Sequence, residues 1–130
     1  MNYGNFIYMS ILDRITGVDN SYIATMTYDT QPAKLKFTCD SDNTPNMSFI
    51  GITKPLLFSE QGFWAWRFDT NLTQYRKEVY QQAGFGPYVA RVFPLTDVVK
   101  FTRNAAFAKE VGVRIRSFEG QQLDLFFKLR

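Results

Sequence analysis

Few residues in this sequence could carry out chemistry, because histidine is absent and cysteine occurs only once. Histidine is the usual general base near neutral pH and a common metal ligand, so Ser-His-Asp triads, Cys-His dyads and most zinc sites lack their central member. Cys39 has no second cysteine with which to form an internal disulfide. Because free cysteine is usually interior, we expect Cys39 to be a small buried apolar residue.

The other candidates for acid–base chemistry are carboxylates, most of them in turn-like stretches. They are Asp13, Asp19, Asp29, Asp40, Asp69 and Glu78. Aspartate in a turn commonly accepts hydrogen bonds from nearby backbone N–H groups, which explains its position without catalysis. No spacing among them fixes a pair of carboxylates on one surface. We therefore expect a protein that is not an enzyme and uses no metal or cofactor.

Aromatic residues interleaved with basic ones form the pattern with the most functional content. Trp64, Trp66 and Phe68 alternate along one predicted strand, and such a row is either the core face of a sheet or an exposed stacking or contact surface. Because Trp, Tyr and Arg most often anchor interfaces, we select contact residues of these kinds from this region. The candidates are Trp64, Trp66, Arg67, Tyr75, Arg76, Phe85 and Tyr88, with Arg114, Arg116 and Lys128 as a secondary basic patch.

Two classes of function fit such a surface. The first is a non-catalytic interaction or structural subunit of a multi-protein assembly, such as a phage particle or a secretion-type complex, with a protein partner or further copies of itself. The alternative is a single-stranded nucleic-acid-binding module, in which exposed aromatics stack on bases and Arg or Lys contacts phosphates. The formal charge is only +3, from 15 basic and 12 acidic residues, which favours the first class.

The length and hydropathy of the chain predict one domain without a membrane span. A chain of 130 residues with 45% hydrophobic content suits a single core. No run of about eighteen apolar residues occurs, and residues 1–12 lack the basic and long apolar regions of a signal peptide. We therefore expect neither a membrane helix nor a signal segment in this stretch, and the compartment stays open.

Alternation of apolar and polar residues with a period of two dominates the chain and predicts strands. We expect strands over residues 6–12 and 22–28, paired as a hairpin, and over residues 34–39, 47–52, 63–68 and 88–95. In the third of these strands, Leu35, Phe37 and Cys39 should face the core. A helix is expected from Asp97 to about Glu110, with Val98, Phe101, Ala105 and Ala108 on one stripe, and the pattern over residues 74–83 is weaker but compatible with a short helix.

The last twenty residues predict a closing hairpin with a defined register. A three-residue loop, residues 118–120, places Ile115 opposite Leu123 and Val113 opposite Leu125, so that both apolar sets share one face. The same register pairs Arg114 with Asp124 and covers Gly112 with Phe126. A two-residue loop would set Ile115 opposite Asp124, and we therefore exclude it.

Together these elements predict a mostly β (α+β) fold. We expect an antiparallel β-sandwich or flattened barrel of about eight strands, with one flanking helix near residues 97–110, as a single domain over residues 1–130.

The order of these elements resembles a loose family of small exported bacterial and phage-encoded proteins that includes the type VI secretion accessory protein VasI. The matching pieces are an N-terminal hairpin, a strand ending in cysteine (35–39), an Arg-Phe-Asp strand end (67–69), Phe101 near a helix start, and a closing hairpin with V-x-V-R (111–114) and apolar-x-F-x-L (125–129). The chain lacks the second cysteine of that pattern. The resemblance implies a small β-sandwich with one helix, a supporting and non-catalytic role, and export.

Overall fold

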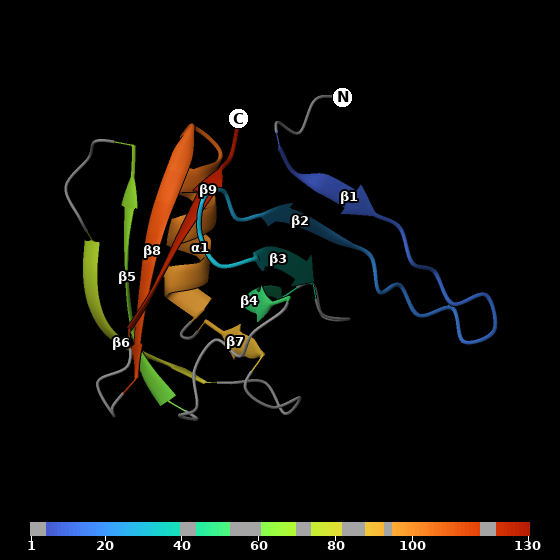
Figure 1. The fold of residues 1–130 in the computed structure, drawn as a ribbon. Coiled ribbons are helices and arrows are strands. Elements are labelled where there is room, and N and C mark those ends of the chain that lie inside the picture. Colours follow the sequence, from blue (N-terminus) through green and yellow to red (C-terminus); the bar gives the residue numbers. More distant parts are fainter. Residues whose placement is uncertain are drawn as a thin grey trace.

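A computed structural model describes residues 5–39, 44–52, 61–69, 74–81, 88–92, 95–117 and 122–130, with the backbone alone described for residues 61–63, 74–81 and 117. Within these ranges the chain forms nine strands and one helix (Figure 1). The strands are β1 (Ile7–Met9), β2 (Tyr22–Met26), β3 (Ala33–Cys39), β4 (Pro45–Gly51), β5 (Gln61–Phe68), β6 (Gln74–Gln81), β7 (Val89–Arg91), β8 (Glu110–Ser117) and β9 (Gln122–Lys128), and the helix is α1 (Leu95–Ala105). The predicted mostly-β fold with a single helix is confirmed.

The strands follow one antiparallel order, β1-β2-β3-β4-β7-β6-β5-β8-β9, that curls into a flattened barrel. Strands β1, β2, β3, β4 and β7 form one layer, and β6, β5, β8 and β9 form the other (Figure 1). The layers meet at two narrow seams. One is the single pair Gln81 and Arg91, and the other is the bridge between Thr27 and Phe127. Eight strands thus close around the core, and β1 extends one layer beyond the closing seam.

The core lies between the two layers, and helix α1 contributes side chains to it. Leu35 and Phe49 from one layer, with Val113 and Phe127 from the other, are buried there as their alternation predicts. Helix α1 buries Phe101 among these side chains, with its ring 6.5 Å from that of Phe37 in one layer and 4.9 Å from that of Phe68 in the other. The predicted apolar stripe is confirmed, because Val98, Phe101 and Ala105 of α1 are buried, as is Ala108 just after the helix.

Helix α1 is shorter than predicted, spanning Leu95–Ala105 rather than residues 97–110. Asp69 fixes the chain at the start of β8. Its carboxylate accepts hydrogen bonds from the N–H groups of Lys109 and Glu110, each at 3.1 Å. The Asp69 N–H in turn donates to the Glu110 carbonyl at 3.1 Å. These bonds hold residues 109 and 110 beside the end of β5, so the helical pattern cannot continue there.

Residues 74–81 form strand β6, so the short helix that the pattern over residues 74–83 allowed does not form. The pairing with β5 sets Gln74 opposite Trp66 and Tyr75 opposite Ala65, with an irregularity at Phe63 and Trp64. The segment contains good helix formers with weak alternation. The backbone hydrogen bonds offered by β5 decide its conformation, as tertiary context commonly does for such segments.

The closing hairpin has the predicted register. Ile115 lies opposite Leu123, Val113 opposite Leu125, and Arg114 opposite Asp124. The loop itself, residues 118–121, lies outside the described residues. Gly112 is covered as expected, because a Cβ atom at this position would lie 2.9 Å from Cε1 of the Phe126 ring.

Cys39 is exposed, so its predicted burial is wrong. Leu35 is fully buried and Phe37 is partly buried, so the alternation holds only for the first part of β3. Cys39 is the last residue of the strand and pairs with Pro45 at the start of β4. The core does not extend to this end of the strand pair.

Candidate interaction surfaces

The two tryptophans are core residues, and their assignment as contact residues is wrong. Trp64 and Trp66 are only 2% and 1% exposed. Because they are two positions apart on β5, both indoles point to the same inner face, where their rings stack at 4.1 Å with an interplanar angle of 24°. Phe101 contacts both rings, at 5.5 and 6.1 Å. The aromatic row is therefore the core face of the sheet, and it offers no surface for stacking on a base or a partner.

Of the remaining candidates, Arg67, Tyr75 and Arg76 belong to the neighbouring strands β5 and β6, and Tyr88 lies beside β4. Arg67 is exposed on β5, in register with Gly112 of β8. Tyr88 is also exposed, but it lies beside β4, where its carbonyl accepts a hydrogen bond from the N–H of Gly51. Arg76 has a described backbone position opposite Trp64 in β6, as Tyr75 does opposite Ala65. Phe85 lies outside the described residues.

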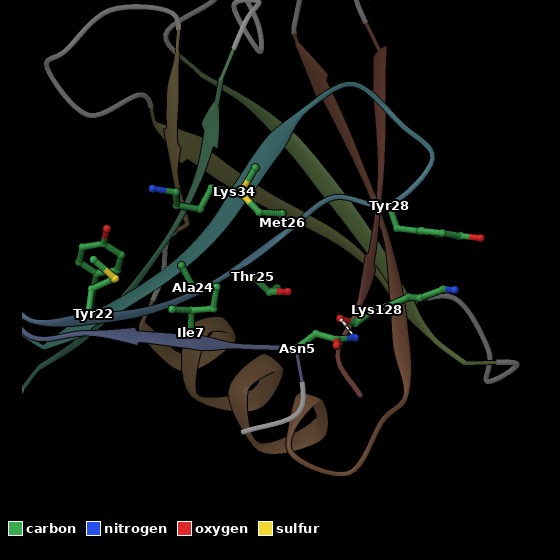
Figure 2. A pocket seen from close by; sticks show the side chains of 10 residues that line it. Asn5, Ile7, Tyr22, Ala24, Thr25, Met26, Tyr28, Lys34 and Lys128 are labelled. Atoms are coloured by element: carbon green, nitrogen blue, oxygen red, sulfur yellow. Dashed lines mark hydrogen bonds between the residues drawn. The ribbon is translucent and has the colours of Figure 1, made fainter. Parts of the chain in front are cut away.

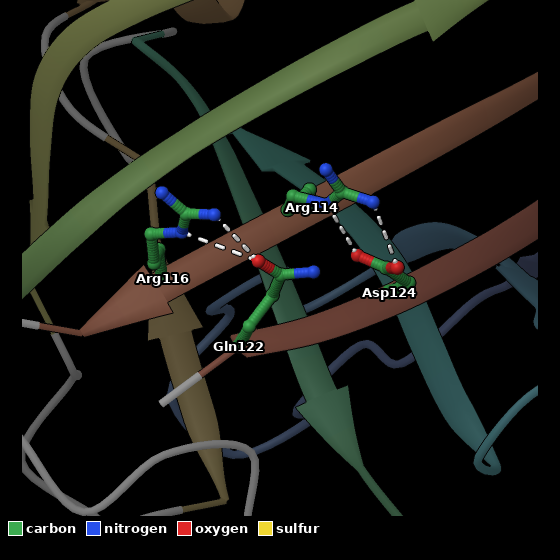
Figure 3. A network of polar contacts seen from close by, with 4 residues as sticks. All are labelled: Arg114, Arg116, Gln122 and Asp124. Atoms are coloured by element: carbon green, nitrogen blue, oxygen red, sulfur yellow. Dashed lines mark hydrogen bonds and ion pairs between the residues drawn. The ribbon is translucent and has the colours of Figure 1, made fainter. Parts of the chain in front are cut away.

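The secondary basic patch consists of two paired guanidinium groups on β8 and a lysine at the end of β9. Arg114 donates two hydrogen bonds to the carboxylate of Asp124, at 2.8 and 3.1 Å, and Arg116 donates two to the side-chain oxygen of Gln122, at 3.2 and 2.7 Å (Figure 3). The hydrogen bond from Arg114 holds the pKa of the Asp124 carboxyl below its ordinary value. These pairs cross the outer surface of β8 and β9 and explain the charges without a ligand.

A feature that the sequence did not single out is a projecting arm, residues 10–21, between β1 and β2. The arm is built from its own hydrogen bonds. The Asp13 N–H donates to the Val18 carbonyl at 2.9 Å, and the Asn20 N–H donates to the Ile11 carbonyl at 2.8 Å. The Asp13 carboxylate caps the turn by accepting from the N–H of Ile15 at 2.8 Å, and this bond lowers the pKa of Asp13. The arm is thus a defined hairpin-like element.

The arm extends away from the barrel and presents apolar side chains to solvent (Figure 1). Every residue from 7 to 20 is exposed, and Ile15 at the tip is 96% exposed. Ile11, Leu12 and Val18 also expose much of their surface. Exposed aliphatic side chains on a projection make the arm a candidate interaction surface, because soluble domains rarely leave large apolar patches in water.

The second feature is a groove on the outer face of β1, β2 and β3, with a volume of about 380 Å³ (Figure 2). Register explains it, because Ile7 lies opposite Ala24 and Met26 lies opposite Lys34, so these side chains share one face. Most of the surface of the groove is apolar, and ten residues line it. They are Asn5, Ile7, Met9, Tyr22, Ala24, Thr25, Met26, Tyr28, Lys34 and Lys128.

Each end of the groove carries lysine beside tyrosine. At one end the Lys34 ammonium lies 5.4 Å from the centre of the Tyr22 ring, and Lys36 lies 4.5 Å from it. At the other end the Lys128 ammonium lies 3.7 Å from the centre of the Tyr28 ring. Figure 2 shows the two ends on opposite sides of Ile7 and Ala24. The site therefore combines an apolar floor with cationic ends, which suits an apolar ligand that carries negative charge.

Sequence reasoning missed both features for identifiable reasons. The arm combines turn residues with aliphatic ones, and we assigned it to a strand end followed by a turn. The groove needs Lys128 of β9 beside Tyr28, which only the closure of the barrel provides. The sequence did contain one signal for the arm, which is the presence of the aliphatic residues Ile15 and Val18 within a turn-rich segment.

Comparison of the chain with protein-family models, curated proteins and solved structures finds no match. Among the described residues, no three His, Cys, Asp or Glu side chains lie close enough to hold a metal ion. The described helix is not of a length and hydropathy that would cross a membrane.

Proposed function

We propose that this protein is a non-catalytic interaction or structural subunit of a multi-protein assembly, such as a phage particle or a secretion-type complex. The observation that carries the proposal is the arm, which holds an aliphatic tip away from the barrel by hydrogen bonds of its own. An ordered projection of this kind gains free energy when its apolar side chains are covered by another molecule. The resemblance to small exported accessory proteins agrees with such a supporting role.

The geometry favours this function over single-stranded nucleic-acid binding. That alternative needed exposed indoles to stack on bases, and Trp64 and Trp66 are buried. The exposed guanidinium of Arg114 is engaged with Asp124. Tyrosine and lysine do lie together in the groove, so nucleic acid stays a competing outcome in the experiments below.

The test compares two variants that each remove one exposed apolar side chain. Ile15→Ser acts at the tip of the arm, and Phe107→Ser acts beyond the end of α1, where the side chain is 82% exposed. Neither replacement should change the free energy of unfolding by more than about 0.5 kcal/mol, because both side chains are in solvent. Native mass spectrometry and light scattering then measure association, with the purified protein alone and after incubation with lysate of its source.

We expect the wild-type protein to form an oligomer or to retain a protein partner in high salt, and Ile15→Ser to weaken that association while Phe107→Ser leaves it intact. A monomer that binds only nucleic acid, and releases it as salt rises, would contradict the proposal, because phosphate contacts are lost with added salt. Equal behaviour of both variants and the wild type would remove the arm as its basis.

A further inference from the structure

We propose that the groove binds the arm of a second copy of this chain, so that copies are joined arm to groove. This inference rests on the proposed function and names the partner of the arm. It follows from the complementary shapes and charges of two surfaces that occur on the same molecule.

The arm has an apolar tip with acidic groups behind it. Ile15 occupies the turn, and Leu12 is bridged to Asp19 across the two sides of the arm. Asp13 and Asp19 flank the turn, and local hydrogen bonds lower the pKa of both carboxyl groups, by the Ile15 N–H at Asp13 and by the Ser21 side chain at Asp19. Both groups are therefore ionised at neutral pH, against the single positive charge of Arg14.

The groove offers the opposite arrangement. Its floor is made by Ile7, Ala24 and Met26, which can cover aliphatic side chains. Lys34 and Lys128 carry positive charge at its two ends. A volume of about 380 Å³ is in the range of sites that hold small molecules, and it admits branched aliphatic side chains of the tip. With the tip on the floor, Asp13 and Asp19, which lie close together across the narrow arm, face a groove that carries lysine and no carboxylate among its lining residues.

The arm that occupies a groove must come from another molecule. The arm continues from β1, which forms one wall of the groove, and it extends away from the barrel (Figures 1 and 2). Folding it back would separate Met9 from Tyr22, the pair from which it starts. Each copy thus presents one free arm and one open groove. Such a contact is repeated from copy to copy, or exchanged between two copies, which is how one chain type builds rings, filaments or dimers.

The decisive test exchanges the charges of the two surfaces. The arm variant, Ser10→Lys/Asn20→Lys, adds positive charge at exposed positions and keeps the carboxylates that hold the turn. The groove variant, Lys34→Glu/Lys128→Glu, reverses both cationic ends. The control variant, Lys100→Glu/Arg103→Glu, makes the same change in net charge on the exposed side of α1. Circular dichroism first verifies that each variant is folded.

Association is measured by analytical ultracentrifugation for each protein and for mixtures. We expect the arm variant and the groove variant each to self-associate at least about tenfold more weakly than the wild type, since like charges then meet at each contact. A mixture of the two should restore association to near the wild-type value, because the positive arm meets the negative groove and the unchanged arm meets the unchanged groove. The control variant should self-associate as the wild type does, because its arm and its groove are both unchanged.

The outcomes separate this inference from the proposed function. Wild-type oligomers that persist in both variants would overturn the arm-to-groove contact and leave the assembly role standing. In another outcome, the wild type is a monomer that holds a different protein in high salt, while Ile15→Ser does not hold it. That outcome would overturn the second copy as the occupant of the groove and would support the assembly role. A monomer that binds oligothymidylate through Lys34 and Lys128, as judged by loss in the groove variant, would overturn both.

Discussion

Replacement of Trp66 tests whether the aromatic row of β5 is a core, as the structure has it, or a contact surface, as the sequence allowed. Trp66 is 1% exposed, stacks on Trp64 and contacts Phe101. Trp66→Ala removes a large aromatic side chain from a closely packed interior. We expect it to lower the free energy of unfolding by about 3–5 kcal/mol.

Trp66→Phe should lower the free energy of unfolding far less than Trp66→Ala does, because two effects of opposite sign partly cancel. Phenylalanine is roughly 40 Å³ smaller, which at about 24 cal/mol per Å³ of residual cavity gives about 1 kcal/mol of destabilisation. Against this, the indole N–H of Trp66 is buried without an acceptor among the described residues, and removing such a group recovers part of a desolvation cost of about 1–3 kcal/mol. The aromatic contact with Trp64 is retained. We therefore expect a net change within about 1 kcal/mol of the wild type.

The assay is urea unfolding followed by far-ultraviolet circular dichroism, which does not depend on the indole that is removed. The fluorescence of the remaining Trp64 in Trp66→Phe should be blue-shifted and protected from iodide, because Trp64 is also buried. A cost below about 1 kcal/mol for Trp66→Ala, with red-shifted and readily quenched emission, would refute the core assignment. If Trp66→Phe costs as much as Trp66→Ala, the reasoning about the unpaired N–H is wrong.

Two further predictions concern the closing hairpin. The folded pKa of Asp124 lies below its ordinary value of 3.8, so its pair with Arg114 stabilises the protein above that value and the effect is lost as pH falls through the folded pKa. Asp124→Asn should therefore destabilise the protein by less than about 1 kcal/mol at neutral pH, because the Arg114 and Asp124 side chains are both about half exposed. The same substitution should have no effect on stability in acid or in high salt. An undiminished effect under those conditions would contradict the pairing. Gly112→Ala should destabilise by about 1 kcal/mol because the new methyl group displaces the Phe126 ring, yet stabilise by about 0.5 kcal/mol when made in a Phe126→Ala background. Urea unfolding of the four proteins in this cycle checks the second prediction, and additive effects would contradict it.

The sequence was sufficient for the parts of the fold in which local pattern and burial agree. The register of the closing hairpin followed from placing Ile115 and Leu123 on one face. The buried stripe of α1 followed from the spacing of Val98 and Phe101. In the hairpin and in the helix, the spacing of the apolar residues along the sequence identifies the buried face directly.

The rest depended on contacts between segments that are distant in sequence. Strand β6 forms because β5 offers it an edge, and α1 ends early because Asp69, far away in the chain, holds Glu110. The choice between core and surface for Trp64 required knowing which face of β5 the helix covers. The candidate site was missed for the same reason, since an arm and a groove are properties of the folded surface rather than of a motif.

The closing seam has a consequence for the order in which the chain is made. The bridge from Thr27 to Phe127 and the bond from the Asn5 N–H to the Leu129 carbonyl join the first part of the chain to the last. During translation, β2 is synthesised well before β9 and β8 immediately before it, and β9 is the strand that pairs with β8 and meets the end of β2. Their edges stay open until β9 leaves the ribosome, and open strand edges are where nascent chains pair wrongly. Synthesis that stalls before residue 122 would thus leave an unclosed barrel whose arm is already complete.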